Sequence, residues 1–168
     1  MPRWIRVTQT ISDLVAPRVM AAAVRTACNG WVTARRFQGR SSCIMGCAGE
    51  DAIEHYAFCR SYHGCCSRYL GLRRPSMEHA LEDFVGIDRS SLTSWGNPSL
   101  TEAEKSALRA ISIYALHMTH AQVRHGLRVA EAANAFRGHL REATRRHPRS
   151  TELMVRAFAA RGARTTRG

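Results

Sequence analysis

The chain has 168 residues and a hydrophobic content of 45%, which suits one domain with a buried core. No apolar run reaches the about 20 residues that cross a bilayer, and the first residues lack the apolar centre of a secretory signal. We therefore expect an intracellular protein, nuclear or cytoplasmic, without a membrane partner. The formal net charge of +12 predicts a polyanionic partner, namely nucleic acid.

The positive charge is concentrated toward the two ends of the chain. Residues 1–49 carry +6 and residues 137–168 carry +7, whereas residues 50–105 carry −3. Of the 25 basic residues, 24 are arginine, and only Lys105 is lysine. Arginine makes bidentate contacts with phosphate, but an excess of arginine also arises from GC-rich coding sequence. Charge alone leaves both explanations open.

Residues 1–30 are expected to form an N-terminal helix over residues 11–28. Pro17 suits a first turn, and Asn29-Gly30 is a stop signal. The predicted apolar face consists of Val19, Met20, Ala23, Val24, Ala27 and Cys28. Cys28 is therefore predicted to be a core residue and not a metal ligand.

The next residues, Trp31 to Gln38, have side chains of alternating character and include β-branched ones, which favours a short extended arm. Arg35, Arg36 and Arg40 surround Phe37, and basic groups interleaved with an aromatic ring can bind a nucleic-acid backbone and stack a base. A single buried phenylalanine on a solvated basic strand is the commoner explanation of such a pattern. These four residues are the candidate nucleic-acid contacts.

A dense set of metal-ligand residue types follows the arm, in the pattern C-x3-C-x7-H-x3-C. The candidate ligands are Cys43, Cys47, His55 and Cys59. Three thiols and one imidazole suit tetrahedral zinc, and four protein ligands close the site, which favours structural over catalytic zinc. Packing of buried thiols in a small helical core is the alternative. Cys65 and Cys66 could replace a ligand or be spare thiols.

Local signals around these ligands favour a zinc knuckle followed by a helix, in a module spanning residues 31–62. Gly46 and Gly49 permit the backbone turns of a knuckle. Asp51 and Glu54 have the spacing of a capping box, which predicts a helix over residues 51–60. His55 and Cys59 would then share one face of that helix.

Residues 63–148 are predicted to be a helical region that opens with a loop over residues 61–75. A short helix should follow Ser76, and a linker over residues 86–99 should be anchored by Trp95. Thr101 and Glu104 form a second capping box, which opens the longest helix, ending near Gly126. Its predicted apolar stripe is Leu108, Ile111, Tyr114, Ala115 and Met118.

The helical pattern resumes with Val129, Ala133, Phe136 and Leu140 and is expected to end at Pro148. Residues 149–168 should form a basic C-terminal helix capped by Ser150, followed by a disordered tail over residues 161–168. The fold class is therefore mainly α, with a small zinc knuckle packed against several amphipathic helices.

Three histidines on the predicted long helix, His117, His120 and His125, raise the possibility of a second metal site. No carboxylate or thiol lies at a suitable offset from them, and His125 is more than a turn beyond the first pair. Polar surface histidines are the preferred interpretation.

The segment Asn29 to Gln38, the two knuckle cysteines, and Glu54-His55-Tyr56 with Cys59 together resemble the zinc-binding C-terminal region of non-LTR (LINE-like) retrotransposon reverse transcriptases. That family carries a C-x2-C…H-x3-4-C pattern with acidic residues before the histidine, where this chain has Asp51 and Glu54. The knuckle departs from the family by having three residues between its thiols. The resemblance covers residues 29–62.

The resemblance implies that the four candidate ligands hold structural zinc in a module that contacts template RNA or target DNA. No Tyr-x-Asp-Asp-like pair or paired acids of a nuclease occur, so the chain is not expected to be an enzyme, although it could be a fragment of an RNA-directed DNA polymerase polyprotein. The alternatives are a protein-interaction module, with a partner groove on residues 101–147, and a decayed transposon remnant.

Overall fold

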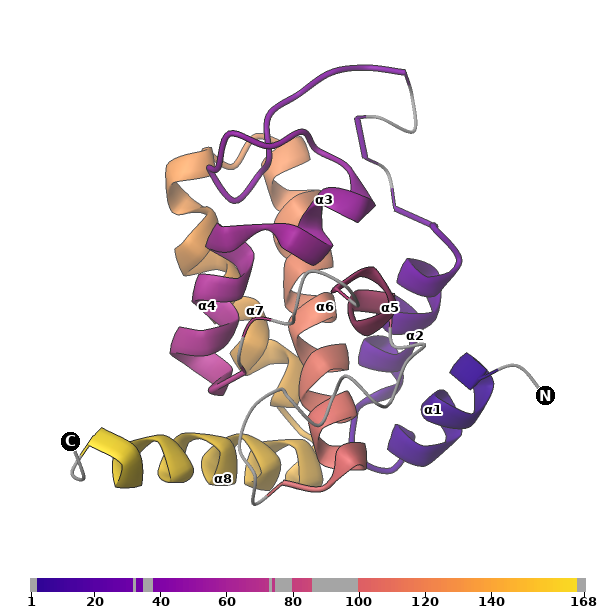
Figure 1. Ribbon diagram of the computed structural model, residues 1–168, viewed down its shortest axis with the longest axis vertical. Helices are drawn as coiled ribbons and strands as arrows, with labels where there is room; N and C mark the ends of the chain where they lie inside the picture. Colours follow the sequence, from indigo (N-terminus) through magenta and orange to yellow (C-terminus); the bar gives the residue numbers. More distant parts are fainter. Residues whose placement is uncertain are drawn as a thin grey trace.

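A long helix, α6 (Glu102–Arg124), runs through the centre of the computed structural model (Figure 1). The structure describes residues 3–31, 33–34, 38–72, 74, 80–85 and 100–165. Every residue of α6 from Lys105 to Leu116 is buried. A helix that is buried on all sides forms the axis around which other helices pack. The capping box that predicted its start is present: Glu104 N–H donates to Thr101 Oγ1 (3.3 Å), and Thr101 N–H donates to Glu104 Oε2 (2.8 Å).

The other helices surround α6 and build one continuous core with it. In chain order they are α1 (Arg3–Ile11), α2 (Pro17–Ala27), α3 (Ile53–Phe58), α4 (Arg60–Leu70), α5 (Ala80–Val85), the 3-10 turn η3 (Val129–Glu131), α7 (Ala132–Thr144) and α8 (Pro148–Thr165). Helix α7 returns along α6, and α8 crosses the end opposite the knuckle (Figure 1). The core extends from Ile11 to Ala157 along the sequence.

The expectation of a mainly α protein is confirmed. Within the described ranges no β-strand occurs, and the only ladder-type pairing there is an isolated antiparallel bridge between Ser42 and Glu50. Of the expected arm, Trp31 is fully buried, whereas Val32 and residues 35–37 lie outside the described residues. Met77 and the expected linker over residues 86–99, with Trp95, also lie outside them.

The N-terminal segment contains two helices where one was predicted. Ala16 has an extended backbone (ψ 150°), because a residue that precedes proline is disfavoured in the α region, and Pro17 then starts α2. Helix α2 ends at Ala27, as the Asn29-Gly30 signal predicted, and Asn29 takes a positive φ of 51°. Cys28 therefore caps the helix end and is exposed, so the prediction that it belongs to the core was wrong.

Residues 60–70 form helix α4, which overturns the prediction of a loop starting at residue 61. Tyr62, Cys66 and Leu70 lie one turn apart and are all buried. Gly64 faces open space on the other side of the helix. The burial of three side chains, of which Tyr62 and Leu70 are large, outweighs the helix-propensity cost of one glycine, which is about 1 kcal/mol.

The C-terminal part departs from the prediction in two ways. Pro148 starts α8 and does not end the preceding helix, which stops at Thr144, and Ser150 lies inside the first turn of α8. The hydroxyl of Ser150 donates to the carbonyl of Leu14 (2.7 Å), and the Ser150 N–H donates to His147 Nδ1 (3.2 Å). The predicted disordered tail is helical as far as Thr165, because an existing helix gains one hydrogen bond with each residue added.

Candidate metal centre

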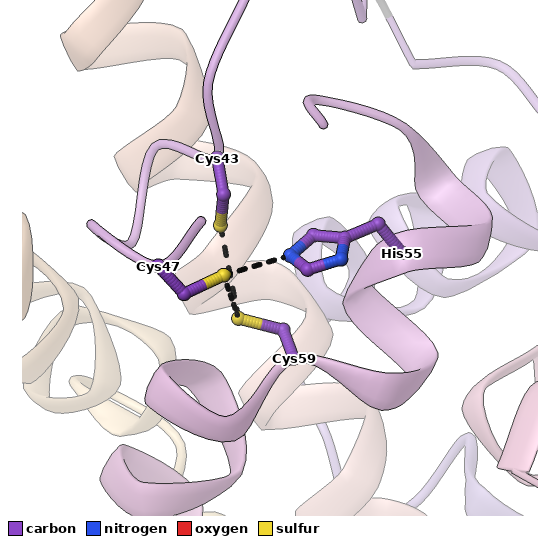
Figure 2. Close-up of side chains that lie close together, drawn as sticks. All are labelled: Cys43, Cys47, His55 and Cys59. Atoms are coloured by element: carbon purple, nitrogen blue, oxygen red, sulfur yellow. Dashed lines mark hydrogen bonds between the residues drawn. The ribbon is translucent and has the colours of Figure 1, made fainter. Parts of the chain in front are cut away.

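The four residues selected from their spacing lie together at the knuckle end of the molecule. Their ligand atoms are all within 4.8 Å of one another. The Sγ atoms of Cys43 and Cys47 each lie 3.7 Å from Sγ of Cys59, and Cys47 Sγ lies 3.0 Å from Nε2 of His55. Figure 2 shows the three thiols and the imidazole pointing toward one common point.

The geometry of this cluster fits a tetrahedral metal ion. Four ligands around zinc, with Zn–S bonds of about 2.3 Å, place two sulfur atoms about 3.8 Å apart. The two S···S distances of 3.7 Å agree with that value. The Cys47–His55 distance of 3.0 Å is shorter than the about 3.6 Å expected for a zinc-bound S···N pair. The Cys3His cluster could therefore hold a metal ion with a small movement of the imidazole.

A tight turn places the first two thiols. The Cys43 N–H donates to the carbonyl of Gly49 (2.8 Å), and the Gly46 N–H donates to the carbonyl of Cys43 (3.0 Å). Gly46 has a φ of +78°, a conformation that L side chains rarely adopt. The Met45 N–H points at Cys43 Sγ (3.4 Å). The knuckle backbone therefore supplies hydrogen bonds to the thiol that it positions.

Two short helices place the other two ligands. His55 lies on α3, and Cys59 lies at the junction of α3 and α4. Cys59 is also the N-cap of α4, where its Sγ accepts the N–H of Tyr62 (3.4 Å). The helix N-terminus and the Tyr62 N–H favour the thiolate form of Cys59, but the hydrogen bond with Cys43 and burial outweigh them.

Packing against Gly49 fixes the imidazole of His55. A β-carbon at residue 49 would overlap the His55 ring atoms Cε1, Nδ1 and Nε2. The absence of a side chain at Gly49 therefore leaves the space that the His55 ring occupies. The sequence indicated glycine here for backbone freedom, but the structure requires it for close approach.

The three thiols do not share one protonation behaviour. The hydrogen bond from the Cys59 thiol, helped by the Met45 N–H, lowers the pKa of Cys43 to about 5 against the opposing effect of burial. The same bond and burial raise the pKa of Cys59. Metal binding replaces the thiol protons, because the ligand form of cysteine is thiolate.

Asp51, predicted to cap a helix, is a buried hydrogen-bond acceptor instead. Helix α3 starts at Ile53 with Ala52 as its N-cap and has no side-chain cap. The Asp51 carboxylate is 1% exposed and accepts the Ala34 N–H (2.9 Å), the Tyr56 hydroxyl (2.6 Å) and the Nε2 of His120 (3.0 Å). Burial opposes its ionisation, but these hydrogen bonds prevail and lower its pKa.

The three histidines of the possible second metal site, and the described cysteines outside the cluster, do not join it. His120 is buried against Asp51, His117 packs edge-on to Trp31 with ring centroids 5.4 Å apart, and His125 is exposed at the end of α6. Cys65 and Cys66 lie on α4, and burial raises the pKa of Cys66 to about 12. Among the described residues, the only group of three or more His, Cys, Asp or Glu side chains arranged to hold a metal is the Cys3His cluster.

An open groove borders the cluster on the outer face of the knuckle. Its lining residues are Arg40, Ser41, Ser42, Ala48, Gly49 and Glu50. Arg40, a candidate nucleic-acid contact, is exposed there, whereas the other three candidates, Arg35, Arg36 and Phe37, lie outside the described residues. The groove therefore brings one arginine, two serines and one glutamate together beside the cluster.

No family of known proteins, no curated protein and no solved structure matches this chain. In the part of the chain that is described, no helix has the length and apolar character needed to cross a membrane. The fold and site define a mainly helical protein with a possible Cys3His metal centre.

Proposed function

We propose that this protein is a non-catalytic nucleic-acid-binding module stabilised by one structural zinc ion, related to the C-terminal tail of LINE-like reverse transcriptases. The observation that carries the proposal is the position of the Arg40 groove on the same short turn as the Cys3His cluster. A metal that fixes the turn would also fix the groove.

The donor set supports zinc in a structural role. Three thiols and one imidazole are ligands that zinc prefers, and four protein ligands leave no position for water or substrate. Cys43 and Cys59 are fully buried, while Cys47 and His55 are half-buried. A closed and largely buried site would contribute its binding energy to folding.

The surroundings of the knuckle support a polyanionic partner. The turn between α6 and α7 lies beside the knuckle, since a β-carbon on Gly46 would be 3.6 Å from Cγ1 of Val129. That turn carries Arg128, whose side chain is 80% exposed, and it follows Arg124 at the end of α6. These two arginines add positive charge beside the knuckle, of the kind that attracts a phosphate backbone, although Arg128 pairs with Glu131 and Arg124 lies 3.9 Å from Asp51.

The protein-interaction alternative has less support. It placed a partner groove on residues 101–147, but the apolar stripe of α6 is buried between the other helices. Leu108 and Ile111, which would have lined such a groove, are fully buried.

Binding of the zinc-loaded protein to labelled single-stranded RNA and duplex DNA tests the proposal. We expect affinity that falls steeply with salt, because arginine–phosphate contacts release counterions. The triple variant Arg35→Ser, Arg36→Ser, Arg40→Ser should bind more weakly, with a salt slope lower by about one unit for each phosphate that the variant no longer neutralises.

A matched control is Arg6→Ser, which removes an exposed arginine from α1, away from the knuckle (Figure 1). It should bind as the unmodified chain does. Binding that hardly changes between low and moderate salt, or that the triple and Arg6 variants lose equally, would contradict the proposed interface.

A further inference from the structure

Asp51 joins four segments of the chain through hydrogen bonds. Its carboxylate accepts the Ala34 N–H from the arm, the Tyr56 hydroxyl from α3 and the Nε2–H of His120 from α6. Its own N–H donates to the carbonyl of Ser41, just before the knuckle (2.9 Å). One residue thus contacts the segment before the first ligand, the helix that carries the third ligand, and the central helix.

The site around this carboxylate is closed and polar. Asp51 is 1% exposed and His120 is 3% exposed. The guanidinium of Arg124 lies 3.9 Å from Asp51 Oδ2, and the Arg124 side chain is 37% exposed. A buried carboxylate is stable only when its oxygens are satisfied, so removal of one donor leaves a costly unpaired group.

On the metal side, Asp51 lies in sequence between Cys47 and His55 and holds the residue next to His55. Tyr56 follows His55, and the ring centroids of the two are 5.6 Å apart. The tyrosine hydroxyl bound to Asp51 is buried, so α3 can rotate little about its axis without breaking this bond. The orientation of α3 decides where the imidazole of His55 points.

On the other side, His120 connects Asp51 to the body of the protein. The His120 ring packs against the ring of Trp31, with centroids 5.7 Å apart. Trp31 Nε1–H donates to Thr26 Oγ1 on α2 (2.7 Å), which in turn donates to the carbonyl of Ala22 (2.8 Å). The chain of contacts from α2 through α6 to α3 is therefore continuous and buried.

From this arrangement we infer that Asp51, held by His120, is a positioning residue for the metal centre, which makes metal affinity depend on the docking of α3 onto α6. The inference rests on the zinc site of the proposed function and is independent of nucleic-acid binding. Outer partners that orient metal ligands typically change metal affinity 10- to 100-fold when removed.

The test measures zinc affinity, by competition with a chromophoric chelator, and thermal unfolding of the zinc-loaded protein. His120→Ala should weaken zinc binding about 10-fold or more. His120→Gln keeps an N–H donor at this place and should recover a large part of that loss. The Co2+-substituted His120→Ala protein should show a shifted or weaker ligand-field spectrum.

Ser150→Ala is the matched control for a loss of stability alone. Ser150 is buried and joins α8 to Leu14 by a hydrogen bond. Helix α8 lies at the end of the molecule opposite the knuckle (Figure 1). This variant should lower the melting temperature without changing zinc affinity. If His120→Ala lowers the melting temperature as Ser150→Ala does but keeps full zinc affinity, the inference is overturned while the zinc site stands. If the unmodified chain binds no zinc, the proposed zinc site and the inference are both overturned.

Discussion

The imidazole of His55 occupies the space that a side chain at Gly49 would need. This contact sets the ring of a candidate ligand directly on the knuckle backbone. We therefore expect Gly49→Ala to push His55 away from the thiols and to weaken zinc binding by an order of magnitude or more, as measured by chelator competition.

Gly64→Ala is the control for this substitution. Gly64 lies in the interior of α4, and a β-carbon added there would meet no atom within 4 Å. Alanine there should leave zinc affinity unchanged and stabilise the protein by about 0.5–1 kcal/mol, because glycine is a poor helix former. Equal zinc affinities in the two alanine variants would show that the contact with Gly49 does not position His55 for zinc.

Replacement of Cys59 by serine should remove a metal ligand while keeping a good N-cap for α4, because serine is a preferred N-cap residue. Cys59 Sγ lies 3.7 Å from two other thiols and accepts the Tyr62 N–H. We expect about one zinc per purified chain, and we expect Cys59→Ser to lose zinc and part of the helical circular-dichroism signal. Cys65→Ser, on the same helix but outside the cluster, should keep its zinc. Elemental analysis of reduced protein gives the answer, and retention of zinc by Cys59→Ser would exclude this ligand set.

His63 should make the protein less stable in mild acid. Burial lowers the pKa of His63 from 6.5 to about 4, while its Nε2 is bound to the carbonyl of Ala57. As the pH falls below 6.5, His63 becomes protonated in the unfolded chain, whereas in the folded chain it stays neutral until about pH 4. The contribution of His63 to stability is therefore full above pH 6.5 and is lost on acidification.

Urea unfolding at several pH values tests this effect. At pH 7 the parent protein should have a higher free energy of unfolding than His63→Gln. This difference should shrink by at most about 3 kcal/mol between pH 7 and pH 4.5. Zinc release affects both proteins and cancels in the difference. A difference that stays constant with pH would mean that folding does not lower the pKa of His63.

Removal of the cap of α6 should destabilise the whole protein. Thr101 accepts the Glu104 N–H and starts the helix on which the core is built. Thr101→Ala should cost about 1 kcal/mol, seen as a lower urea midpoint at unchanged slope. Thr10→Ala, the same change within α1, should have little effect, because alanine is the better helix former there.

Local signals in the sequence predicted the features that depend on neighbours in the chain. The spacing of Cys43, Cys47, His55 and Cys59 was sufficient to place the cluster, since all four lie on one turn and two short helices. We could also predict from the sequence that α2 starts at Pro17 and α6 after Thr101, because proline and a capping box act over three or four residues.

Features that depend on distant residues were not predictable. Asp51 and His120 are 69 residues apart, and each has a plausible local role, as a cap and as a surface histidine, that the fold overrides. Helix α4 was missed because Gly64 within it and Gly71 at its end favour a loop, whereas the hydroxyl of Tyr62 is hydrogen-bonded to Ser112 on α6 (2.7 Å). Helix α1 was missed because the expected single helix began only at residue 11.

Lys105, the single lysine of the sequence, is buried and bonded to Glu102 (2.9 Å). Amine-directed labels and crosslinkers therefore find no freely accessible lysine side chain on the folded protein. The same holds for enzymes that acetylate lysine, so the positive surface cannot be neutralised by that modification. Control of its charge would have to act on the arginines, or through phosphate groups added to nearby serines, of which Ser41 and Ser42 line the groove beside Arg40.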